Sequence, residues 1–440
     1  MILPTNHFSQ VISVLARLIL LLALLQPAWA YAQFGLGIVA EIEHIENPLR
    51  QPMPEEEELL TSVTVAAQLQ RQTKRFTTSL NYSFNRQDYE QGILNDQTLV
   101  NGAGTLIWNI VPTLFTWSVA NTRTNQLIDN SQPDILTNRQ VVDHTSTGPS
   151  LTIPLDRASF VNVSAQVGFV DFGEFEALQH NRNTLSGSYT RQLDQRFSLS
   201  VQSSITDADY TNAEFLNYKM SNIQGQLQFN GGDLSVTTAL GGQSMDRMGS
   251  TTSSPIRRLD IQYQLNSRLA MTLAYADTVE DLLSDLSTPS AVDQSFVNSD
   301  IALDGNFGST NAANVYQRTE RSVGATYTVP SSYSIGLRYS NNVRRSVDLL
   351  AGDDDERLSA SFNMPLGNRV TFSSSIEFSK QSFAIDQSAL ERTGYRLGVN
   401  YRINDRLGLV FTALDSVQEN IGSNGQIDGK IISLGLSFTR

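Results

Sequence analysis

The sequence contains no cysteine among its 440 residues, which excludes disulfide bonds and a lipid anchor on cysteine. Histidine is almost as scarce, with four in the chain. Basic residues are fewer than acidic ones, 31 against 44, and a net charge of −13 argues against binding to nucleic acid, which needs a basic surface. The lack of cysteine excludes a domain held together by disulfide bonds, and the small number of histidines leaves few candidates for a catalytic centre.

Long hydrophobic runs are also missing, with one exception near the N-terminus. Arg17 precedes the apolar run LILLLALL, residues 18–25, and small residues follow at Ala28, Ala30 and Ala32. This pattern predicts a signal peptide over residues 1–32, cleaved after Ala30 or Ala32. The run is shorter than the roughly 20 residues that a membrane-spanning helix needs. The mature chain, residues 33–440, has no apolar run long enough for such a helix.

What the chain has in abundance is alternation of apolar and polar residues. The stretch YRLGVNYRINDRLGLVFTALD, residues 395–415, alternates with period two on both sides of a short polar interruption. The same pattern surrounds turns centred near residues 73, 112, 156, 194, 231, 267, 331, 367 and 405. Period-two alternation around a turn of two to five residues predicts an antiparallel β-hairpin.

The spacing of these turns predicts a transmembrane antiparallel up-and-down β-barrel. Short turns alternate with longer connections, as in outer-membrane barrels with short periplasmic turns and long external loops. Nine hairpins and two end strands, residues 34–45 and 429–440, give twenty strands, with eighteen as the alternative count. Residues 280–318 fill the widest interval and are expected to form one long loop. Residues 33–440 would then form a single all-β domain.

The two faces of such a barrel follow from the bilayer and the strand number. The apolar set must face lipid, and a barrel of this width leaves a water-filled lumen for the polar set. Aromatic residues near the turns, such as Trp108, Trp117 and Tyr333, suit an interfacial girdle. The lumen-lining candidates are Arg258, Asp260, Gln262, Gln264, Arg338, Glu377, Arg396, Asn400 and Arg402.

The last strand carries apolar residues on one face, up to an aromatic residue near the C-terminus. These are Ile432, Leu434, Leu436 and Phe438. A C-terminal strand of this kind resembles the signal that the outer-membrane insertion machinery recognises, although Thr439 and Arg440 follow the aromatic residue.

Residues with catalytic or ligand-binding chemistry are sparse. The mature chain has His44, His144 and His180, none beside a convincing serine or aspartate partner, so we expect no enzyme, cofactor or metal site. Two acidic runs, residues 55–58 and 353–356, are expected in external loops. They favour solvated loops over a divalent-cation site, and both interpretations stay open.

Several stretches resemble one family, the outer-membrane β-barrel proteins associated with exopolysaccharide and PEP-CTERM (exosortase) gene clusters. The similarity covers most of the mature chain and lies in the order of hairpins and in phrases such as Glu46-Asn47-Pro48 and Gly148-Pro149. The longer stretches are FGLGIVAEIEHIENP, LIWNIVPTLFTWSV, TGPSLTIPL and NRNTLSGSYTRQLDQRFSLSVQSS. The resemblance implies a role at the outer membrane in making or exporting surface polysaccharide, and it implies no catalytic residues.

The sequence therefore predicts a non-enzymatic outer-membrane channel, with polysaccharide export as the leading function. A general diffusion porin is one alternative, and a structural or adhesive barrel with a plugged lumen is another. The expected partners are outer-membrane lipid and lipopolysaccharide, the insertion machinery, and a polysaccharide with periplasmic export components.

Overall fold

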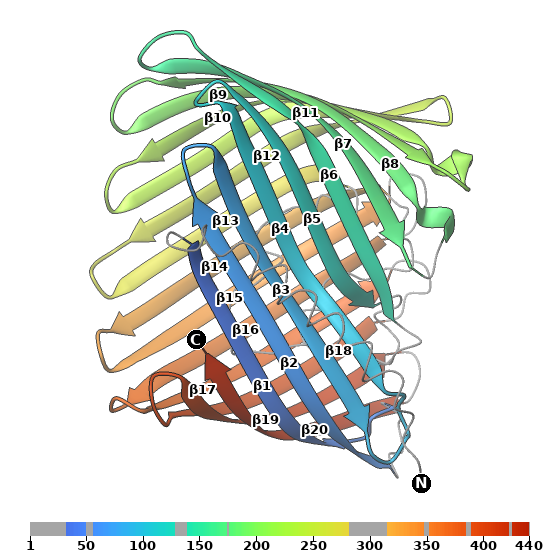
Figure 1. The fold of residues 1–440 in the computed structure, drawn as a ribbon, viewed down its shortest axis with the longest axis vertical. Coiled ribbons are helices and arrows are strands. Elements are labelled where there is room, and N and C mark those ends of the chain that lie inside the picture. Colours follow the sequence, from blue (N-terminus) through green and yellow to red (C-terminus); the bar gives the residue numbers. More distant parts are fainter. Residues whose placement is uncertain are drawn as a thin grey trace.

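The chain folds into a closed barrel of twenty antiparallel strands (Figure 1). The computed structural model describes residues 32–49, 56–127, 139–173, 176–280, 315–346, 352–383, 389–421 and 425–439. Each strand pairs with its neighbours in sequence, and β1 closes the barrel by pairing with β20 from Gly37↔Thr439 to Glu46↔Lys430. Within the described residues, no helix is long and apolar enough to cross a membrane.

The strands are similar in length and follow one another without a crossover. In the first half they are β1 Ala32–Glu46, β2 Glu57–Gln72, β3 Phe76–Tyr89, β4 Gln97–Val111, β5 Phe115–Leu127, β6 Arg139–Pro154, β7 Ser159–Phe172, β8 His180–Gln192, β9 Phe197–Tyr210 and β10 Tyr218–Asn230. In the second half they are β11 Leu234–Arg247, β12 Ser250–Gln264, β13 Leu269–Glu280, β14 Tyr316–Val329, β15 Tyr333–Ser346, β16 Gly352–Leu366, β17 Val370–Phe383, β18 Ala389–Arg402, β19 Leu407–Ile421 and β20 Gly425–Thr439. Two single-turn 3₁₀ helices, η3 Glu176–Leu178 and η4 Glu214–Leu216, lie between strands.

The predicted barrel with twenty strands is confirmed, and the alternative of eighteen is wrong. All nine predicted short turns join the expected strands at one end of the barrel, which we call the turn end. The opposite end, the loop end, carries most of the longer connections. One connection there departs from the predicted asymmetry: Met248 and Gly249 alone join β11 to β12, with φ of 50° and 78°. Positive φ at both central residues is the geometry of a tight two-residue hairpin.

Side chains within the turns fix several of the hairpins at the turn end. Asp194 Oδ1 accepts hydrogen bonds from the backbone N–H groups of Arg196 (2.6 Å) and Phe197 (2.8 Å). Asn404 Oδ1 accepts the equivalent pair from Arg406 (2.8 Å) and Leu407 (3.0 Å). The side chain of Asp or Asn thus closes its own turn, which explains why these residue types mark the hairpins in the sequence.

Two sequence predictions concern residues outside the described part of the chain. The signal peptide, residues 1–32, lies there except for its last residue, and so does the interior of the predicted long loop, residues 281–314. The two ends of that predicted loop, Glu280 and Arg318, belong to strands β13 and β14. Their side chains form an ion pair, with Arg318 Nη1 3.2 Å from Glu280 Oε2.

The acidic runs were expected in loops, and this is wrong for most of their residues. Asp353 to Glu356 form the first part of β16, and Glu57 and Glu58 begin β2. Glu58 is buried, and its carboxylate accepts hydrogen bonds from the backbone N–H groups of Gln91 (2.7 Å) and Ile93 (2.9 Å) in the β3–β4 connection. The reason is that partners distant in sequence satisfy these carboxylates: the β3–β4 connection binds Glu58, and Arg344 of β15 pairs with Asp353.

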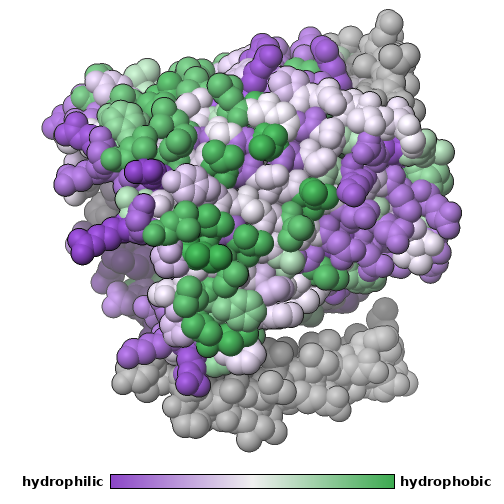
Figure 2. All heavy atoms as spheres, turned by 90° about the horizontal axis from the view of Figure 1, so that it is seen from above, coloured by the Kyte–Doolittle hydropathy of each residue, from purple (hydrophilic) through white to green (hydrophobic). Residues whose placement is uncertain are grey.

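The outer face of the barrel is apolar in a band next to the turn end. Along β9, Phe197, Leu199, Val201 and Ile205 point outward, and Asp207 follows on the same face. At about 3.3 Å per residue and a tilt of about 40°, Phe197 to Ile205 covers about 20 Å of the barrel axis. Figure 2 shows apolar residues gathered on one side of the barrel, with hydrophilic residues at both margins. The band approaches the height of about 25 Å of transmembrane barrels.

Aromatic side chains line the turn-end margin of this band. Phe76 stacks on Trp108 at 6.1 Å, and Phe197 lies 4.7 Å from Phe229, measured between ring centroids. A further row runs across four strands through Tyr327, Tyr333, Phe362 and Phe372. Aromatic rings at this level suit the boundary between hydrocarbon and water. On β20, Ile432, Leu434, Leu436 and Phe438 share the outer face, and their recognition by insertion machinery stays a prediction.

Candidate functional site

The pairing register places all nine lumen-lining candidates on the inner face of the barrel wall. On β12, Ile261 pairs with Val236 and Leu273, which share the apolar outer face, so the residues on either side of it point inward. The same alternation, followed from strand to strand, turns inward Arg258, Asp260, Gln262, Gln264, Arg338, Glu377, Arg396, Asn400 and Arg402. Their role in conduction or binding stays a prediction.

The structure brings three of these candidates together and leaves the others apart. Asp260, Gln262 and Arg338 line one cavity of about 490 Å³ on the inner face of β12–β16. Glu377 instead lies 3.5 Å from Arg357 Nε in an ion pair. Arg402 lies at the turn end, where its guanidinium donates to the carbonyl of Asn368. The nine residues therefore do not form a single ring around the lumen.

The inner face of β12–β18 carries many charges of both signs, and we call it the charged wall. Its inward charged residues are Arg258, Asp260, Glu280, Arg318, Glu320, Arg338, Arg344, Asp353, Asp355, Arg357, Glu377, Arg392, Arg396 and Arg402. Towards the loop end they form ion pairs, both across adjacent strands and between neighbours on one strand. Arg318 reaches Glu280 (3.2 Å) and Glu320 (3.1 Å), and Arg344 reaches Asp353 (3.6 Å).

The inner face of β3–β10 is different, and we call it the neutral wall. Among the described strand residues that point inward there, Arg182 is the one with a permanent charge, and serine, threonine, asparagine and glutamine predominate. Hydroxyl groups meet across the strands, as in Ser164 with Ser186 (2.6 Å) and Thr184 with Thr206 (3.2 Å). This surface offers hydrogen-bond donors and acceptors without a strong electric field.

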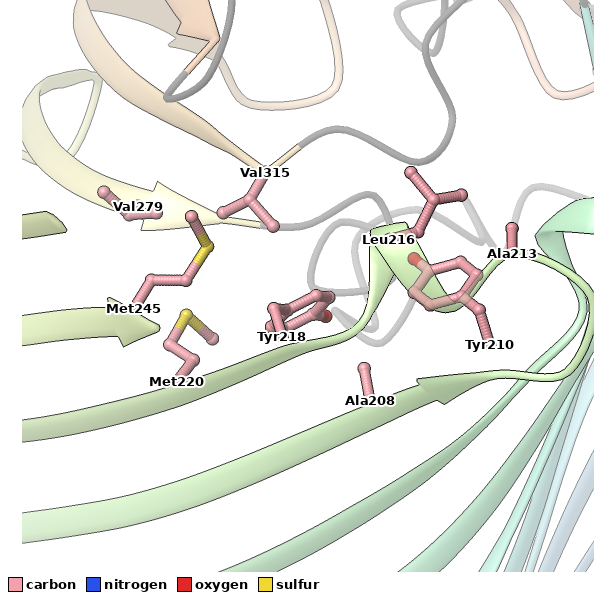
Figure 3. Close-up of a cluster of buried hydrophobic side chains, with 9 residues drawn as sticks. All are labelled: Ala208, Tyr210, Ala213, Leu216, Tyr218, Met220, Met245, Val279 and Val315. Atoms are coloured by element: carbon pink, nitrogen blue, oxygen red, sulfur yellow. The ribbon is translucent and has the colours of Figure 1, made fainter. Parts of the chain in front are cut away.

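At the loop end, the inner face of β9–β11 is apolar and packed, which the sequence analysis missed. Tyr210, Tyr218, Met220 and Met245 are buried together with Leu216 of η4 (Figure 3). Val279 and Val315, at the facing ends of β13 and β14, join the same cluster. The sequence did contain a signal for this cluster. Large apolar residues occur near the loop ends of these strands, at positions whose neighbours on the same face are polar. The cluster narrows the lumen on this side.

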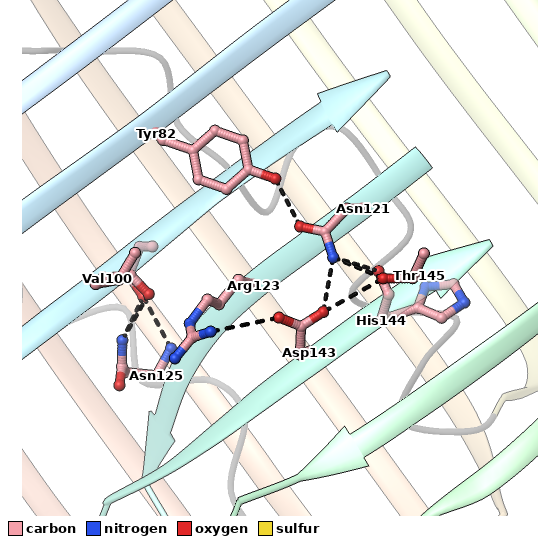
Figure 4. A network of polar contacts seen from close by, with 9 residues as sticks. Tyr82, Val100, Asn121, Arg123, Asn125, Asp143, His144 and Thr145 are labelled. Atoms are coloured by element: carbon pink, nitrogen blue, oxygen red, sulfur yellow. Dashed lines mark hydrogen bonds and ion pairs between the residues drawn. The ribbon is translucent and has the colours of Figure 1, made fainter. Parts of the chain in front are cut away.

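A second polar network lies on the outer face, beyond the apolar band. The Tyr82 hydroxyl donates to Asn121 Oδ1 (2.6 Å), and Asn121 Nδ2 donates to Asp143 Oδ1 (2.6 Å), which also faces Arg123 (Figure 4). The Tyr82 ring reaches Asn121 by lying over Gly102, where a Cβ would come within 2.4 Å of the ring. Gly102 is thus needed for the close approach of this ring to β4.

The described histidines lie on both faces of the barrel wall. His44 points outward and lies 3.7 Å from Glu57. His144 and His180 point inward on either side of Val170, and the His180 ring stacks 4.3 Å from Tyr210. No group of three or more His, Asp or Glu side chains among the described residues is placed to hold a metal ion. His180 serves packing at the loop end.

No protein-family model matches this sequence, and neither does any curated protein sequence. The fold, in contrast, has similar solved structures. The FrpB iron transporter from Neisseria meningitidis (F5-1 variant) aligns with a TM-score of 0.50 at 8% identity, covering 92% of this chain and 82% of that chain.

Two other barrels align less well. The siderophore receptor PirA from Pseudomonas aeruginosa gives a TM-score of 0.48 at 10% identity, covering 93% of this chain and 80% of that chain. A loop-deletion mutant of OmpT, an outer membrane protein of Vibrio cholerae, gives 0.36 at 10% identity, covering 93% and 99%. At these identities the likeness concerns architecture alone, and the architecture is that of outer-membrane β-barrels.

Proposed function

We propose that this chain is a non-enzymatic channel of the bacterial outer membrane that passes a hydroxyl-rich surface polysaccharide. In this proposal residues 1–32 are a cleaved signal peptide, and the apolar band contacts lipid and lipopolysaccharide. The outer face of β20, with Leu434 and Phe438, presents the strand that the insertion machinery recognises. The height of the apolar band, which approaches that of transmembrane barrels, supports a location in the outer membrane.

The observation that carries the proposal is the neutral wall. A polysaccharide presents hydroxyl groups along its whole length, and these exchange hydrogen bonds with serine, threonine and amide side chains. On this wall Asn162 Nδ2 bonds to Ser150 and Thr152, and Gln224 Nε2 bonds to Gln202, so the groups form shared networks that can rearrange. With few charges, the wall holds a neutral polymer weakly at many points, which suits passage better than tight binding.

A strain without this gene provides the test. Surface polysaccharide should fall and polymer in the periplasm should rise, and both should recover when the intact gene is restored. A control strain would carry a version lacking residues 425–440, which removes β20 and therefore barrel closure. Unchanged polymer in both compartments would contradict the proposed function.

The buried cluster at the loop end supports a second candidate, a structural barrel that conducts little. Met220, Met245 and Tyr218 occupy part of the lumen mouth. Conductance of the purified protein in planar bilayers separates the candidates: an open channel gives large steps, and a plugged barrel gives none. Large steps together with unchanged polysaccharide would favour a general diffusion porin.

A further inference from the structure

The charged wall contains a recess bordered by polar side chains without side-chain partners among the described residues. The cavity of about 490 Å³ lies on the inner face of β12–β16, below the ion pairs of the loop end. Arg338, Asp260 and Gln262 border it. None of these three side chains forms a hydrogen bond or ion pair with another side chain in the part of the chain that the structure describes. Arg318, Arg344 and Arg357 of the same wall do form ion pairs, so Arg338 differs from them.

The floor of the recess is built from small residues brought into one row by the register. Gln262 pairs with Thr272, Thr272 with Gly324, and Gly324 with Arg338. Three strand spacings of about 4.8 Å separate Gln262 from Arg338, about 14 Å in all. The two ends of this row carry long polar side chains and the middle carries a hydroxyl and a glycine. A flat, extended ligand can therefore lie across the strands.

Glycine at the floor keeps the recess open, because a side chain there would fill it. A Cβ at Gly324 would come 2.8 Å from Thr272 Oγ1, and one at Gly336 would come 2.7 Å from Ser361 Oγ. Larger residues here would displace hydroxyl groups that line the recess. Ala274 and Ser322, on the adjacent row, are also small. The wall thus exposes hydroxyl groups at a depth that a sugar ring can reach.

The charges favour an anionic ligand at one end. Asp260 has Arg258 two residues away on the same face of β12, about 7 Å along the strand, which offsets its charge. Arg338 is flanked in its row by Gly324 and Ser359, which are neutral. Its planar guanidinium is exposed and matches a carboxylate with two parallel hydrogen bonds.

We propose that this recess binds a uronate-bearing saccharide, with Arg338 holding the sugar carboxylate and Gln262, Asp260 and Thr272 bonding to sugar hydroxyl groups. The inference deepens the proposed function, on which it rests, by naming acidic sugar units as part of the transported polymer. It assigns the neutral wall to the uncharged stretches of the same polymer and the recess to its acidic units.

The test measures binding of fluorescently labelled tetragalacturonate to the full-length protein refolded in detergent, with neutral maltotetraose as the comparison ligand. Wild-type protein should bind the uronate more tightly. R338Q should weaken uronate binding about ten- to hundredfold, the range for one charge-assisted contact, and leave maltotetraose nearly unchanged. R338K should retain part of the difference. R392Q is the matched control, since Arg392 points into the lumen on β18, where it bonds to Gln418 at 2.9 Å, and does not line the recess.

A second variant keeps the test decisive if R338Q fails to fold. A274F fills the recess without changing any charge and should weaken both saccharides. Equal affinity of wild-type protein for the two saccharides, or equal losses in R338Q and R392Q, would overturn the proposed site. These results concern binding in vitro, so a failure here is distinct from a failure of export in the deletion strain.

Discussion

Both walls of the lumen present a polar surface inside a wide barrel, but they do so with different kinds of side chain. The neutral wall, β3–β10, uses hydroxyl and amide groups that bond to one another. The charged wall, β12–β18, uses arginines and carboxylates that pair across adjacent strands near the loop end. On the neutral wall, removal of one hydroxyl or amide group should cost little stability, because water can bond to the partner that remains. On the charged wall, removal of one ion leaves a partly buried partner without its counter-charge, which should cost more.

The two walls also differ in the electric field that they produce in the lumen. Charges of both signs on one side of the lumen create a local field there, while the opposite side has almost none. Under the proposed function, a polymer entering the barrel would meet neutral hydrogen-bonding groups on one side and charged groups on the other. Substitutions on either wall test this contrast.

Reversing charge on the charged wall should change ion selectivity most. In the triple variant R338E, R396E and R402E, three inward cations become anions, so the permeability ratio of cations to anions should rise several-fold. Reversal potentials in planar bilayers under a salt gradient measure this ratio.

The matched control places three glutamates on the outer face of the loop end, at Asn181, Asn183 and Thr319. These positions do not face the lumen, so selectivity should stay at the wild-type value. A folded, conducting triple variant with unchanged selectivity would refute the assignment of these arginines to the pore.

Removing one arginine from the paired part of the charged wall should cost stability. Arg318 contacts Glu280, Glu320 and Asn342, and its side chain is 22% exposed. R318A leaves two partly buried carboxylates without their cation, so the free energy of unfolding should fall by about 2 kcal/mol. Urea titration in detergent, followed by the heat-dependent mobility of the barrel on gels, measures the loss.

An exposed ion pair supplies the reference for this value. Lys380 and Glu391 lie 2.7 Å apart, but their side chains are 47% and 43% exposed. K380A should lower the free energy of unfolding far less than R318A does, because water screens such exposed pairs. Similar losses in the two variants would mean that the pairs of the charged wall are not coupled as proposed.

Much of the barrel follows from the sequence because side chains alternate with period two and turn residues mark the nine hairpins at the turn end. The number of strands, the inward or outward direction of their side chains and all nine short turns could be predicted from these two signals. The position of Asp353 could not, because aspartate is rare in strands and its partner Arg344 lies on the neighbouring strand. The recess needs the five strands β12–β16 in register, and an error of one residue at a turn would point Gly324 or Arg338 outward.

The loop-end cluster shows a second limit of sequence analysis. Tyr210, Met220 and Met245 lie on the inner face, where polar residues were expected. Their burial depends on η4 and on the ends of β13 and β14, which are distant in sequence. Alternation identifies the face of a residue but not what covers that face.

A single hydroxyl on the neutral wall should matter little. Ser186 contacts Ser164 at 2.6 Å, and S186A leaves a hydroxyl that lumen water can bond, so the loss should be below about 0.5 kcal/mol. The same urea titration measures it beside R318A. A loss as large as that of R318A would show that the neutral wall is coupled too, and the contrast between the walls would fail.

The smallest expected effect concerns the hairpin turns that join the strands of each wall at the turn end. Asp156 and Asp194 close hairpins of the neutral wall, whereas Asn266 and Asn404 close hairpins of the charged wall with the same backbone contacts. Hydrogen bonds from the backbone N–H groups of Arg196 and Phe197 hold the pKa of Asp194 below its ordinary value. The carboxylate therefore stabilises the fold above its unfolded pKa, and this contribution disappears as the pH falls through the lower folded pKa.

Exchanging the two residue types should exchange this pH dependence. D194N keeps the acceptor oxygen but cannot titrate, so between pH 6 and pH 2 it should lose less stability than wild-type protein. N404D should lose more, because it introduces the same titrating contact below the charged wall. Urea midpoints at the two pH values measure both changes. If D194N and wild-type protein lost stability equally on acidification, the acid sensitivity would come from the carboxylates of the charged wall and not from these turns.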